Sequence, residues 1–522
     1  MDLTEETLSA GDLSTAQNPK MDRRAWALIA VCLLSTCWSL PVQNVYELEN
    51  NHTDHSDESK SLEVFEIIIK ENEGTSQLVH EGDIAVQRDR SAKVCPKNSC
   101  FWPKSIDGTV PVPYTLSSTY SPSDVAAFNE AMLEFATLTC IRFVEGTKEA
   151  DYLQISSDGG CWSYIGKAGG AQQVSLSAGC LTKGPIQHEL NHALGFFHEQ
   201  SRSDRDKYVT IMTENIAPEY LPNFNKENSN NLDLQYDYSS IMHYSMYAFS
   251  GNNGPTIVPK PNPNTPIGQR DGLSNLDIAK INTLYQCGIY STLLTTQRGT
   301  VMSTNKPSSY PNNAKCMYLI RVPVYKVFLQ FDAFDLQSSP NCSSDYLTIY
   351  DGNNKASPVL LRKACGTRQL PPFTSTGKEM LLEFVTDGSI TANGFRASYD
   401  NVVCGYTFTS SPGTVSSPNF PNNYSNNMNC SFYIVAPDGY KVSLTFTSFD
   451  VEDDVNCYFD SLSIFNGAKL TSPLVDIYCG SKIVPTVTST RSSLLLQFQS
   501  DTSETLKGFQ ATYTFGKFTS AC

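Results

Sequence analysis

Histidine is scarce in this chain, with only seven among 522 residues. Long apolar runs are missing as well. No stretch of about 18 consecutive apolar residues occurs, so the mature protein should not span a membrane with a helix. Positive charge is also low, with 38 Lys and Arg against 53 Asp and Glu and a net charge of −15. This balance excludes nucleic acid and anionic membranes as the main partners.

An apolar leader lies close to the N-terminus. Met21-Asp-Arg-Arg is followed by the run AWALIAVCLLSTCW (25–38) and then by small and polar residues. A charged start before a hydrophobic stretch too short to span a bilayer comfortably is typical of a signal peptide, with a membrane anchor as the alternative. We therefore predict an N-terminal extension and signal peptide over 1–40 and a secreted, extracellular protein, whose 16 cysteines can form disulfides.

The next segment has the character of a pro-segment. Residues 41–90 are charged, free of cysteine and weakly patterned. They end in VQRDRSAKVC, where Arg88 and Arg90 offer an exposed trypsin-like cleavage site. We therefore expect a zymogen that is cut after Arg90.

The length allows about three further domains. Between 91 and 287, helical and extended patterns are mixed: SPSDVAAFNEAMLEFATLT (121–139) has a Ser/Asp cap and apolar residues at helical spacing. ADYLQISS (150–157) and AQQVSLSA (171–178) are predicted strands. This segment therefore contains both helices and strands.

From about residue 288 the chain repeats itself. GTVMSTNKPSSYPNNAKC (299–316) realigns with GTVSSPNFPNNYSNNMNC (413–430) at an offset of 114. Short alternating segments separated by Gly, Pro and Asn turns are typical of all-β sandwiches. We therefore predict two homologous modules over 288–403 and 404–517, followed by a tail over 518–522.

The histidines concentrate in HELNHALGFFHEQ (188–200). On a helix, His188 and His192 lie one turn apart on the same face, where both can bind one Zn²⁺ at about 2.0–2.1 Å. Gly195 can take the left-handed conformation that ends the helix, and the turn returns His198 as a third ligand. Three protein ligands leave one position for water, which is typical of a catalytic site. Glu189, beside the metal, can take the proton of that water as it attacks a carbonyl.

The full spacing H-E-x-x-H-x-x-G-x-x-H is typical of the metzincins, which also have a methionine turn downstream. YSSIMHYSM supplies this turn, with Met242 as the methionine under the zinc site. With HEQSRSDRD after the third histidine, the segment from Cys95 to Cys287 resembles the astacin family of zinc endopeptidases. The resemblance implies that residues 161–180 include the edge strand that binds an extended peptide substrate.

The astacin resemblance also implies roles for single residues. Tyr244 would bind zinc in the resting enzyme and swing to stabilise the oxyanion, as a phenol donor can. Glu199 would receive the new N-terminal ammonium of Ser91 after activation. Asp83, in HEGDI, would occupy the water position of the zymogen, although the family usually has Phe where His80 stands. Each role is a prediction for the structure to locate.

The two β-modules resemble CUB domains, through FDLQSSPNCSSDYLTIYDG in the first, FDVEDDVNCYFDSLSIFNG in the second and a closing Gly-Phe in both. Many CUB domains bind Ca²⁺ with one Glu and two Asp. The matching residues of the second module are Glu452, Asp460 and Asp501. In the first module Gln337 replaces the Glu, so calcium should bind there more weakly.

The two resemblances also imply a disulfide framework. The implied pairs are Cys95–Cys100, Cys140–Cys287, Cys161–Cys180, Cys342–Cys365, Cys404–Cys430 and Cys457–Cys479. Tyr290 stands where the repeat predicts a cysteine, so Cys316 could pair with Cys522, with another chain or with nothing. Secretion would also open three N-x-S triplets to glycosylation, at Asn341, Asn423 and Asn429.

The sequence therefore predicts a multidomain protein in which an α+β metzincin-type zinc protease domain (91–287) precedes two all-β CUB sandwiches. We expect one catalytic Zn²⁺ and Ca²⁺ in the second CUB domain. The order of the parts is similar to that of amphibian and fish hatching enzymes, which implies egg-envelope glycoprotein substrates bound partly through the CUB domains. The alternatives are a tolloid-like matrix or growth-factor-processing protease, whose EGF-like modules are absent here, and a CUB-mediated binding protein with an inactive protease scaffold.

Overall fold

A computed structural model describes residues 64–86, 100–146, 148–269, 271–303 and 309–517 of the chain. The predicted signal peptide, the cleavage site at Arg88 and Arg90, and Ser91 lie outside these residues. Among the residues that are described, no helix is both long enough and apolar enough to cross a membrane.

The mixed domain, residues 64–286 as described, is built on a seven-stranded sheet of order β1-β2-β6-β7-β5-β3-β4. Its strands are β1 (Val79–His80), β2 (Ile84–Ala85), β3 (Val110–Leu116), β4 (Ile141–Glu145), β5 (Tyr152–Ser156), β6 (Cys161–Ser163) and β7 (Ala171–Leu176). The predicted strands at 150–157 and 171–178 are confirmed as β5 and β7. β6 runs antiparallel to β7, whereas the other pairs from β7 to β4 are parallel.

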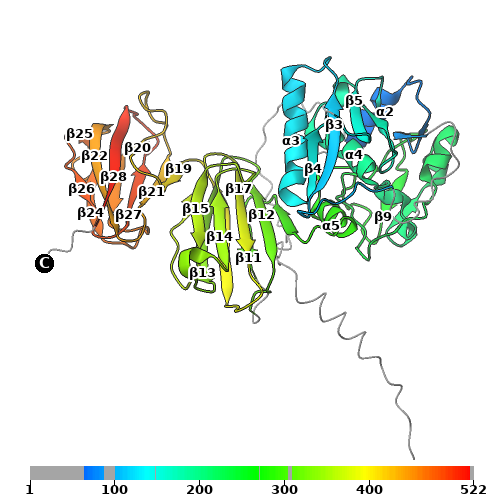
Figure 1. The fold of residues 1–522 in the computed structure, drawn as a ribbon. Helices are drawn as coiled ribbons and strands as arrows, with labels where there is room; N and C mark the ends of the chain where they lie inside the picture. Colours follow the sequence, from blue (N-terminus) through cyan, green and yellow to red (C-terminus); the bar gives the residue numbers. More distant parts are fainter. Residues whose placement is uncertain (1–63, 87–99, 147, 270, 304–308, 518–522) are drawn as a thin grey trace, which may run out of the picture. The chain divides into compact units, whose positions relative to one another are not determined.

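Four α-helices belong to this domain: α2 (Val64–Asn72), α3 (Pro122–Leu138), α4 (Lys183–Leu194) and α5 (Asn275–Leu284). α3 begins as predicted, because the Ser121 hydroxyl accepts from the Asp124 backbone N–H and the Asp124 carboxylate accepts from the Ser121 N–H. α3 and α4 pack against each other (Figure 1). They share a core with the sheet in which Phe128, Phe135 and Leu190 are fully buried.

Short elements complete the mixed domain. They are η2 (Ala178–Cys180), η3 (Glu199–Ser201), η4 (Arg205–Lys207), η5 (Thr213–Asn215), η6 (Pro218–Phe224), β8 (Val209–Ile211) and β9 (Ile257–Pro259). β8 and β9 form a separate two-stranded antiparallel sheet. The part of the domain that contains these short elements has its own small core, in which Tyr244 and Phe224 pack with Phe65 of α2.

The first β-module has two sheets, of order β10-β12-β17-β14-β15 and β11-β18-β13-β16. The elements are β10 (Tyr290–Leu294), β11 (Gly299–Met302), β12 (Lys315–Arg321), β13 (Lys326–Asp335), η7 (Pro340–Cys342), β14 (Tyr346–Tyr350), β15 (Val359–Ala364), β16 (Phe373–Thr374), β17 (Glu379–Val385) and β18 (Gly394–Val402). Side chains from both sheets, among them Tyr318, Phe384 and Phe395, form one buried core. The predicted sandwich is therefore present.

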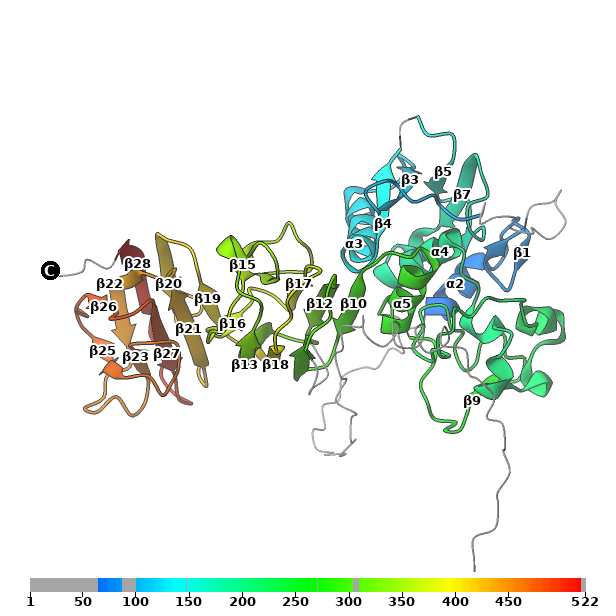
Figure 2. The same cartoon turned by 60° about the horizontal axis from the view of Figure 1, so that its bottom comes forward.

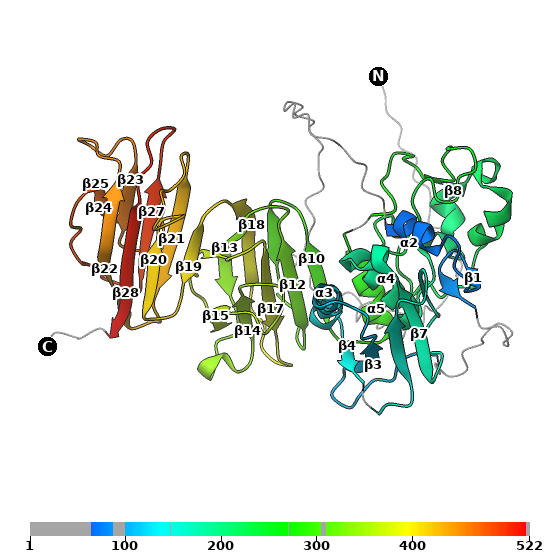
Figure 3. The same cartoon turned by 90° about the horizontal axis from the view of Figure 1, so that it is seen from above.

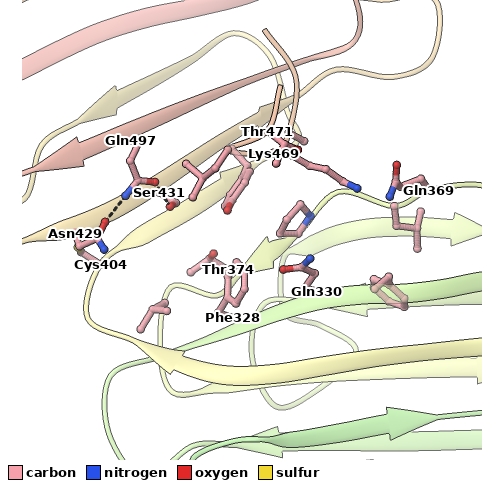
Figure 4. A pocket seen from close by; sticks show the side chains of 17 residues that line it. Phe328, Gln330, Gln369, Thr374, Cys404, Asn429, Ser431, Lys469, Thr471 and Gln497 are labelled. Atoms are coloured by element: carbon pink, nitrogen blue, oxygen red, sulfur yellow. Dashed lines mark hydrogen bonds between the residues drawn. The ribbon is translucent and has the colours of Figure 1, made fainter. Parts of the chain in front are cut away.

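The second β-module repeats this plan, with sheets of order β19-β21-β27-β23-β24 and β20-β28-β22-β25, and with β26 paired to β22. The strands are β19 (Gly405–Phe408), β20 (Gly413–Ser416), β21 (Asn429–Val435), β22 (Tyr440–Val451), β23 (Ser461–Phe465), β24 (Leu474–Tyr478), β25 (Gly480–Ser481), β26 (Val487–Thr488), β27 (Ser493–Gln499) and β28 (Gly508–Lys517). The Gln497 side chain of β27 bonds those of Ser431 and Asn429 on β21 (Figure 4).

Strand register supports the repeat and explains the missing cysteine. β10 pairs in parallel with β12 and places Tyr290 opposite Cys316, as Figure 2 shows for the two strands. β19 pairs in parallel with β21 in the same way, and the adjoining Cys404 is bonded to Cys430. Tyr290 therefore occupies in the first module the position that Cys404 has in the second.

Five of the predicted disulfides are formed among the described residues. They are Cys140–Cys287, Cys161–Cys180, Cys342–Cys365, Cys404–Cys430 and Cys457–Cys479. Cys100 and Cys316 are disulfide-bonded too, so Cys316 is not a free thiol. Cys95 and Cys522 lie outside the described residues.

The predicted glycosylation acceptors Asn341, Asn423 and Asn429 are all exposed. The Asn423 amide nitrogen donates to the Thr505 carbonyl oxygen at 2.6 Å, whereas the Asn429 side chain uses its oxygen as an acceptor from Gln497. Glycosylation at the three sites stays a prediction.

Candidate active site

Helix α4 and the bend after it position the three histidines. His188 and His192 lie on α4, which ends at Gly195 in the left-handed conformation, with φ 108°. A Cβ atom at Gly195 would lie 2.8 Å from the Phe101 ring, so both the backbone angle and the space require glycine. The chain turns there and brings His198 back beside the helix.

The three imidazoles converge on the carboxylate of Asp83. Asp83 Oδ2 lies 3.0 Å from His188 Nε2, and Asp83 Oδ1 lies 3.4 Å from His192 Nε2 and 3.3 Å from His198 Nε2. All four side chains are buried. The structure therefore brings together the four residues that the sequence analysis singled out, and their role as metal ligands stays a prediction.

Each imidazole is oriented through its other nitrogen. His188 Nδ1 lies 2.8 Å from the Ile241 carbonyl oxygen, and His192 Nδ1 lies 2.7 Å from the Phe196 carbonyl oxygen. His198 Nδ1 lies 2.7 Å from Glu81 Oε2. Because all three acceptors require a proton on Nδ1, all three Nε2 lone pairs face the common point.

This donor set fits zinc. Ligands about 2.0–2.2 Å from a tetrahedral Zn²⁺ lie roughly 3.3 Å apart, close to the 3.2 Å between the Nε2 atoms of His188 and His198. His192 Nε2 has no hydrogen-bond partner among the described residues. Three neutral imidazoles and one carboxylate oxygen form a zinc set, in which Asp83 stands where water would bind in an open site.

Charge in this buried pocket shifts the protonation of its members. Burial lowers the pKa of His192 to about 4. Burial also opposes the charged form of His198, but Asp83 and Glu81 outweigh it and raise the pKa of His198 to about 9. Without a cation, one imidazole would therefore hold a proton against the carboxylates, and a bound zinc ion would supply that positive charge instead.

Glu189 is fully buried beside the three histidines. Neither oxygen of its carboxylate has a hydrogen-bond partner among the described residues. Burial, followed by the charge of Asp83, raises the pKa of Glu189 well above its ordinary value. A carboxylate with raised proton affinity and unused oxygens is suited to accept a proton from a water molecule.

The methionine turn adjoins the histidines through Ile241, whose carbonyl oxygen lies 2.8 Å from His188 Nδ1. Met242 is buried, and its carbonyl oxygen accepts from the Glu199 N–H at 2.9 Å. Asp277 of α5 fixes the turn, because its carboxylate accepts from the Ser240 hydroxyl at 2.6 Å and from the Ile241 N–H at 2.9 Å. The sequence reasoning missed Asp277, whose only local signal is its place in the cap of α5.

Tyr244 faces the pocket but is held by Phe65 and Glu81 of the N-terminal residues 64–86. Its hydroxyl donates to the Glu81 carbonyl oxygen at 2.6 Å, and its ring stacks on Phe65 of α2 with centroids 3.8 Å apart. The phenol is fully buried, which raises its pKa well above the ordinary value. Tyr244 therefore contacts residues 64–86 through both its ring and its hydroxyl.

Glu199 is buried and already paired. Its Oε2 lies 2.5 Å from Lys280 Nζ, and its Oε1 lies 3.2 Å from an Arg202 guanidinium nitrogen and accepts from the Asp237 N–H. Ser91, its predicted partner after activation, lies outside the described residues. Lys280 was not foreseen from the sequence, because it lies in a separate helix, α5; Arg202 was missed although it lies only three residues after Glu199.

The N-terminal residues 64–86, which lie in the predicted pro-segment, also cover the predicted edge strand. β2 runs parallel to β6 with Ile84 opposite Ser163, and the Ser163 N–H donates to the Asp83 carbonyl oxygen at 3.1 Å. The Asn72 side chain at the end of α2 bonds both the N–H and the carbonyl oxygen of Cys161. α2 lies beside α4 in Figure 3. The backbone groups that an extended substrate would use are thus occupied.

A second candidate metal site lies in the second β-module, where Glu452, Asp460 and Asp501 place one oxygen each within 4.8 Å of the others. Glu452 Oε2 and Asp460 Oδ2 are buried without a hydrogen-bond partner among the described residues. Burial, followed by the charges of Asp460 and Asp501, raises the pKa of Glu452. Three hard oxygens that repel one another are a suitable set for Ca²⁺.

The first module has the same pair of aspartates but lacks the glutamate. The Asp387 N–H donates to Asp345 Oδ1 at 2.8 Å, as the Asp501 N–H donates to Asp460 Oδ1 at 2.7 Å in the second module. Gln337 stands in place of the glutamate, and its Oε1 is buried without a hydrogen-bond partner among the described residues. An amide oxygen can bind Ca²⁺, but without the charge it attracts the ion less strongly.

Two buried imidazoles on α4 and a third after its glycine bend converge beside Glu189, whose carboxylate has no hydrogen-bond partner among the described residues. This arrangement is that of a metalloendopeptidase. Residues 97–286 match the peptidase family Astacin, and residues 287–399 and 404–513 match the CUB domain. The chain is 47% identical to Embryonic protein UVS.2 of Xenopus laevis over 95% of this chain and 100% of that protein. It is 46% identical to Astacin-like metalloendopeptidase of Gallus gallus over 73% of this chain and 97% of that protein. The chain belongs to the astacin family and has two CUB domains.

Among solved structures, the chain is similar to High choriolytic enzyme 1 of Oryzias latipes, a hatching enzyme zinc-protease. The identity is 53%, the match covers 38% of this chain and 100% of that chain, and the TM-score is 0.37.

Proposed function

We propose that this chain is a secreted zinc endopeptidase made as a zymogen, with residues 41–90 as its pro-segment and 91–287 as its protease domain. The observation that supports this best is the convergence of His188, His192 and His198 on one point. Glu189 lies beside it, with no hydrogen-bond partner for its carboxylate in the part of the chain that the structure describes. We propose that this trio holds the zinc. Once Asp83 has left, a water molecule can take its place.

In the hydrolysis of a peptide bond, Glu189, Tyr244 and β6 then have separate roles. Zinc, when bound, polarises water and the substrate carbonyl. Glu189 takes the proton of the attacking water and passes it to the leaving amine nitrogen. Tyr244 donates to the oxyanion once its hydroxyl is free of Glu81. β6 holds the substrate backbone as an added strand.

The first test is proteolysis itself. Chain cleaved after Arg90 should hydrolyse casein, and a zinc chelator should abolish the activity until Zn²⁺ is restored. Chain handled in the same way without the chelator is the control. Absence of chelator-sensitive hydrolysis would favour a CUB-mediated binding protein with an inactive protease scaffold.

Replacing Tyr244 by Phe removes the phenol hydroxyl and leaves the ring. We expect kcat to fall by about 10²-fold with KM little changed, because the hydroxyl contributes in the transition state and not to substrate binding. Steady-state kinetics on a peptide substrate measure both constants. Tyr247→Phe, at an exposed tyrosine of the same segment, is the matched control. An unchanged kcat in Tyr244→Phe would show that the hydroxyl has no role in catalysis and that Tyr244 only packs.

We further propose that the substrates are egg-envelope glycoproteins digested at hatching. The order of protease and two CUB domains supports this, as does the 47% identity to an embryonic protein over its full length. Isolated egg envelopes incubated with the cleaved chain should lose protein to the supernatant, whereas collagen-rich matrix should not. The reverse result would favour the tolloid-like alternative.

Calcium binding by the second CUB domain is the remaining part of the proposal. Titration calorimetry of the full chain should show Ca²⁺ binding that Glu452→Gln weakens at least about tenfold, because one of three carboxylates loses its charge. Glu504→Gln, an exposed neighbouring change, should bind as the unchanged chain does. Equal Ca²⁺ affinity in Glu452→Gln would show that Glu452, Asp460 and Asp501 do not form the calcium site.

A further inference from the structure

We propose that His80, Glu81 and Glu227 form a second divalent-cation site, suited to Zn²⁺, that joins the pro-segment to the protease domain. The inference rests on the proposal that residues 41–90 are a pro-segment. His80 is the last residue of β1, Glu81 follows it before β2, and Glu227 lies just after η6. Glu227 Oε1 lies 3.1 Å from His80 Nε2, and one ligand atom of each residue lies within 4.8 Å of the other two.

One oxygen of the buried Glu81 carboxylate lacks a hydrogen-bond partner among the described residues. The side chain is fully buried, and its Oε2 is used by His198 Nδ1 at 2.7 Å. Its Oε1 has no hydrogen-bond partner among the described residues and faces His80, with 3.8 Å to Nε2. A buried carboxylate oxygen without a partner is costly, and a hydrogen bond between His80 and Glu227 alone leaves it unsatisfied. A cation between the three side chains satisfies it.

The ligand chemistry favours zinc over calcium or magnesium. One imidazole nitrogen and two carboxylate oxygens form a mixed set that Zn²⁺ accepts at about 2.0–2.2 Å, with ligand atoms roughly 3.3 Å apart. The observed separations of 3.1 and 3.8 Å lie close to this value. The side chains of His80 and Glu227 are 35% and 29% exposed, so an ion can enter and water can complete its coordination.

This site accounts for the departure of HEGDI from the astacin pattern. A phenylalanine at position 80 could not bind a metal, whereas His80 provides the nitrogen ligand. Glu81 would touch both sites, with one oxygen on the new cation and the other on His198 of the catalytic trio. The same cation would also hold Glu81 in place, and the Glu81 carbonyl oxygen accepts from Tyr244. The cation would therefore stabilise the latent state.

The test is the metal content of the full chain, which is kept uncut by Arg88→Gln and Arg90→Gln. The chain is dialysed against buffered Zn²⁺, and excess Ca²⁺ is added to fill the candidate calcium sites of the CUB domains. Elemental analysis should find two zinc ions per chain. His80→Phe and Glu227→Gln should each retain one, and Glu219→Gln, an exposed glutamate of η6, should retain two. Chain cleaved after Arg90 and freed of the pro-segment should also retain one.

One zinc ion in the otherwise unchanged full chain, or two in both His80→Phe and Glu227→Gln, would overturn the proposal. Retention of the catalytic zinc shows that each variant is folded. The result is also separable from the zymogen proposal. If cleavage after Arg90 produced no gain in activity, latency would be refuted, whereas the metal count addresses the cation site alone.

Discussion

Glu189→Gln should reduce kcat/KM by roughly 10³–10⁴-fold while zinc stays bound, because the amide cannot accept the proton of the attacking water. The change is nearly isosteric, and it leaves the three imidazoles and their Nδ1 partners untouched. Since neither oxygen of Glu189 has a hydrogen-bond partner among the described residues, the substitution breaks no bond of the resting pocket. The loss should therefore appear in turnover and not in folding.

The measurement combines kinetics on a peptide substrate with elemental analysis of the same sample. Glu214→Gln, at an exposed glutamate of η5, should keep full activity. If Glu189→Gln turned over substrate at the unchanged rate with zinc bound, the general base would have to be sought elsewhere.

Chain that cannot be cleaved should be latent. With Arg88→Gln and Arg90→Gln, we expect activity at least about 10³-fold below that of the cleaved enzyme. This ratio corresponds to a closed state favoured by roughly 4 kcal/mol. The contacts of Asp83, Phe65 and Asn72 with the histidines, Tyr244 and β6 supply this preference. Trypsin treatment of both chains, followed by casein hydrolysis, measures the ratio.

A second variant separates the contacts. Asp83→Ala in the uncut chain frees the water position but leaves Glu81 and Phe65 on Tyr244. We therefore expect its activity to lie above that of the latent chain and well below that of the cleaved enzyme. Equal activity of the uncut and cleaved chains without any substitution would show that the pro-segment does not inhibit.

Local patterns predicted the centre of the site well. The spacing of His188 and His192 is a property of one helix, and Gly195 is required by one backbone angle, so neither depends on distant residues. The repeat in the two β-modules was equally visible, since Tyr290 and Cys404 occupy equivalent registers. The order of strands in each sheet was not predicted, because the pairing of segments far apart in the sequence leaves no local signal.

The contacts of the N-terminal residues 64–86 were only partly predictable. Asp83 could be assigned through a resemblance, but Phe65 and Glu81 reach Tyr244 and His198 across more than one hundred residues of chain. Phe65 lies in a short apolar helix whose sequence does not show what it packs against. The pair of Glu199 with Arg202, three residues away, is local, whereas the ion pair of Glu199 with Lys280 escaped for the same reason as Phe65. Long-range contacts of this kind depend on the assembled domain.

The stacking of Phe65 on Tyr244 has a consequence for the processed enzyme. Phe65 is buried in a small apolar core with Phe224, Tyr236 and Ile257. If residues 41–90 are cut away as proposed, Phe65 would leave that core and uncover an apolar hollow one ring wide. A bulky apolar side chain of the bound polypeptide would then refill this hollow, so a contact of the proposed precursor would also set a side-chain preference of the mature protease.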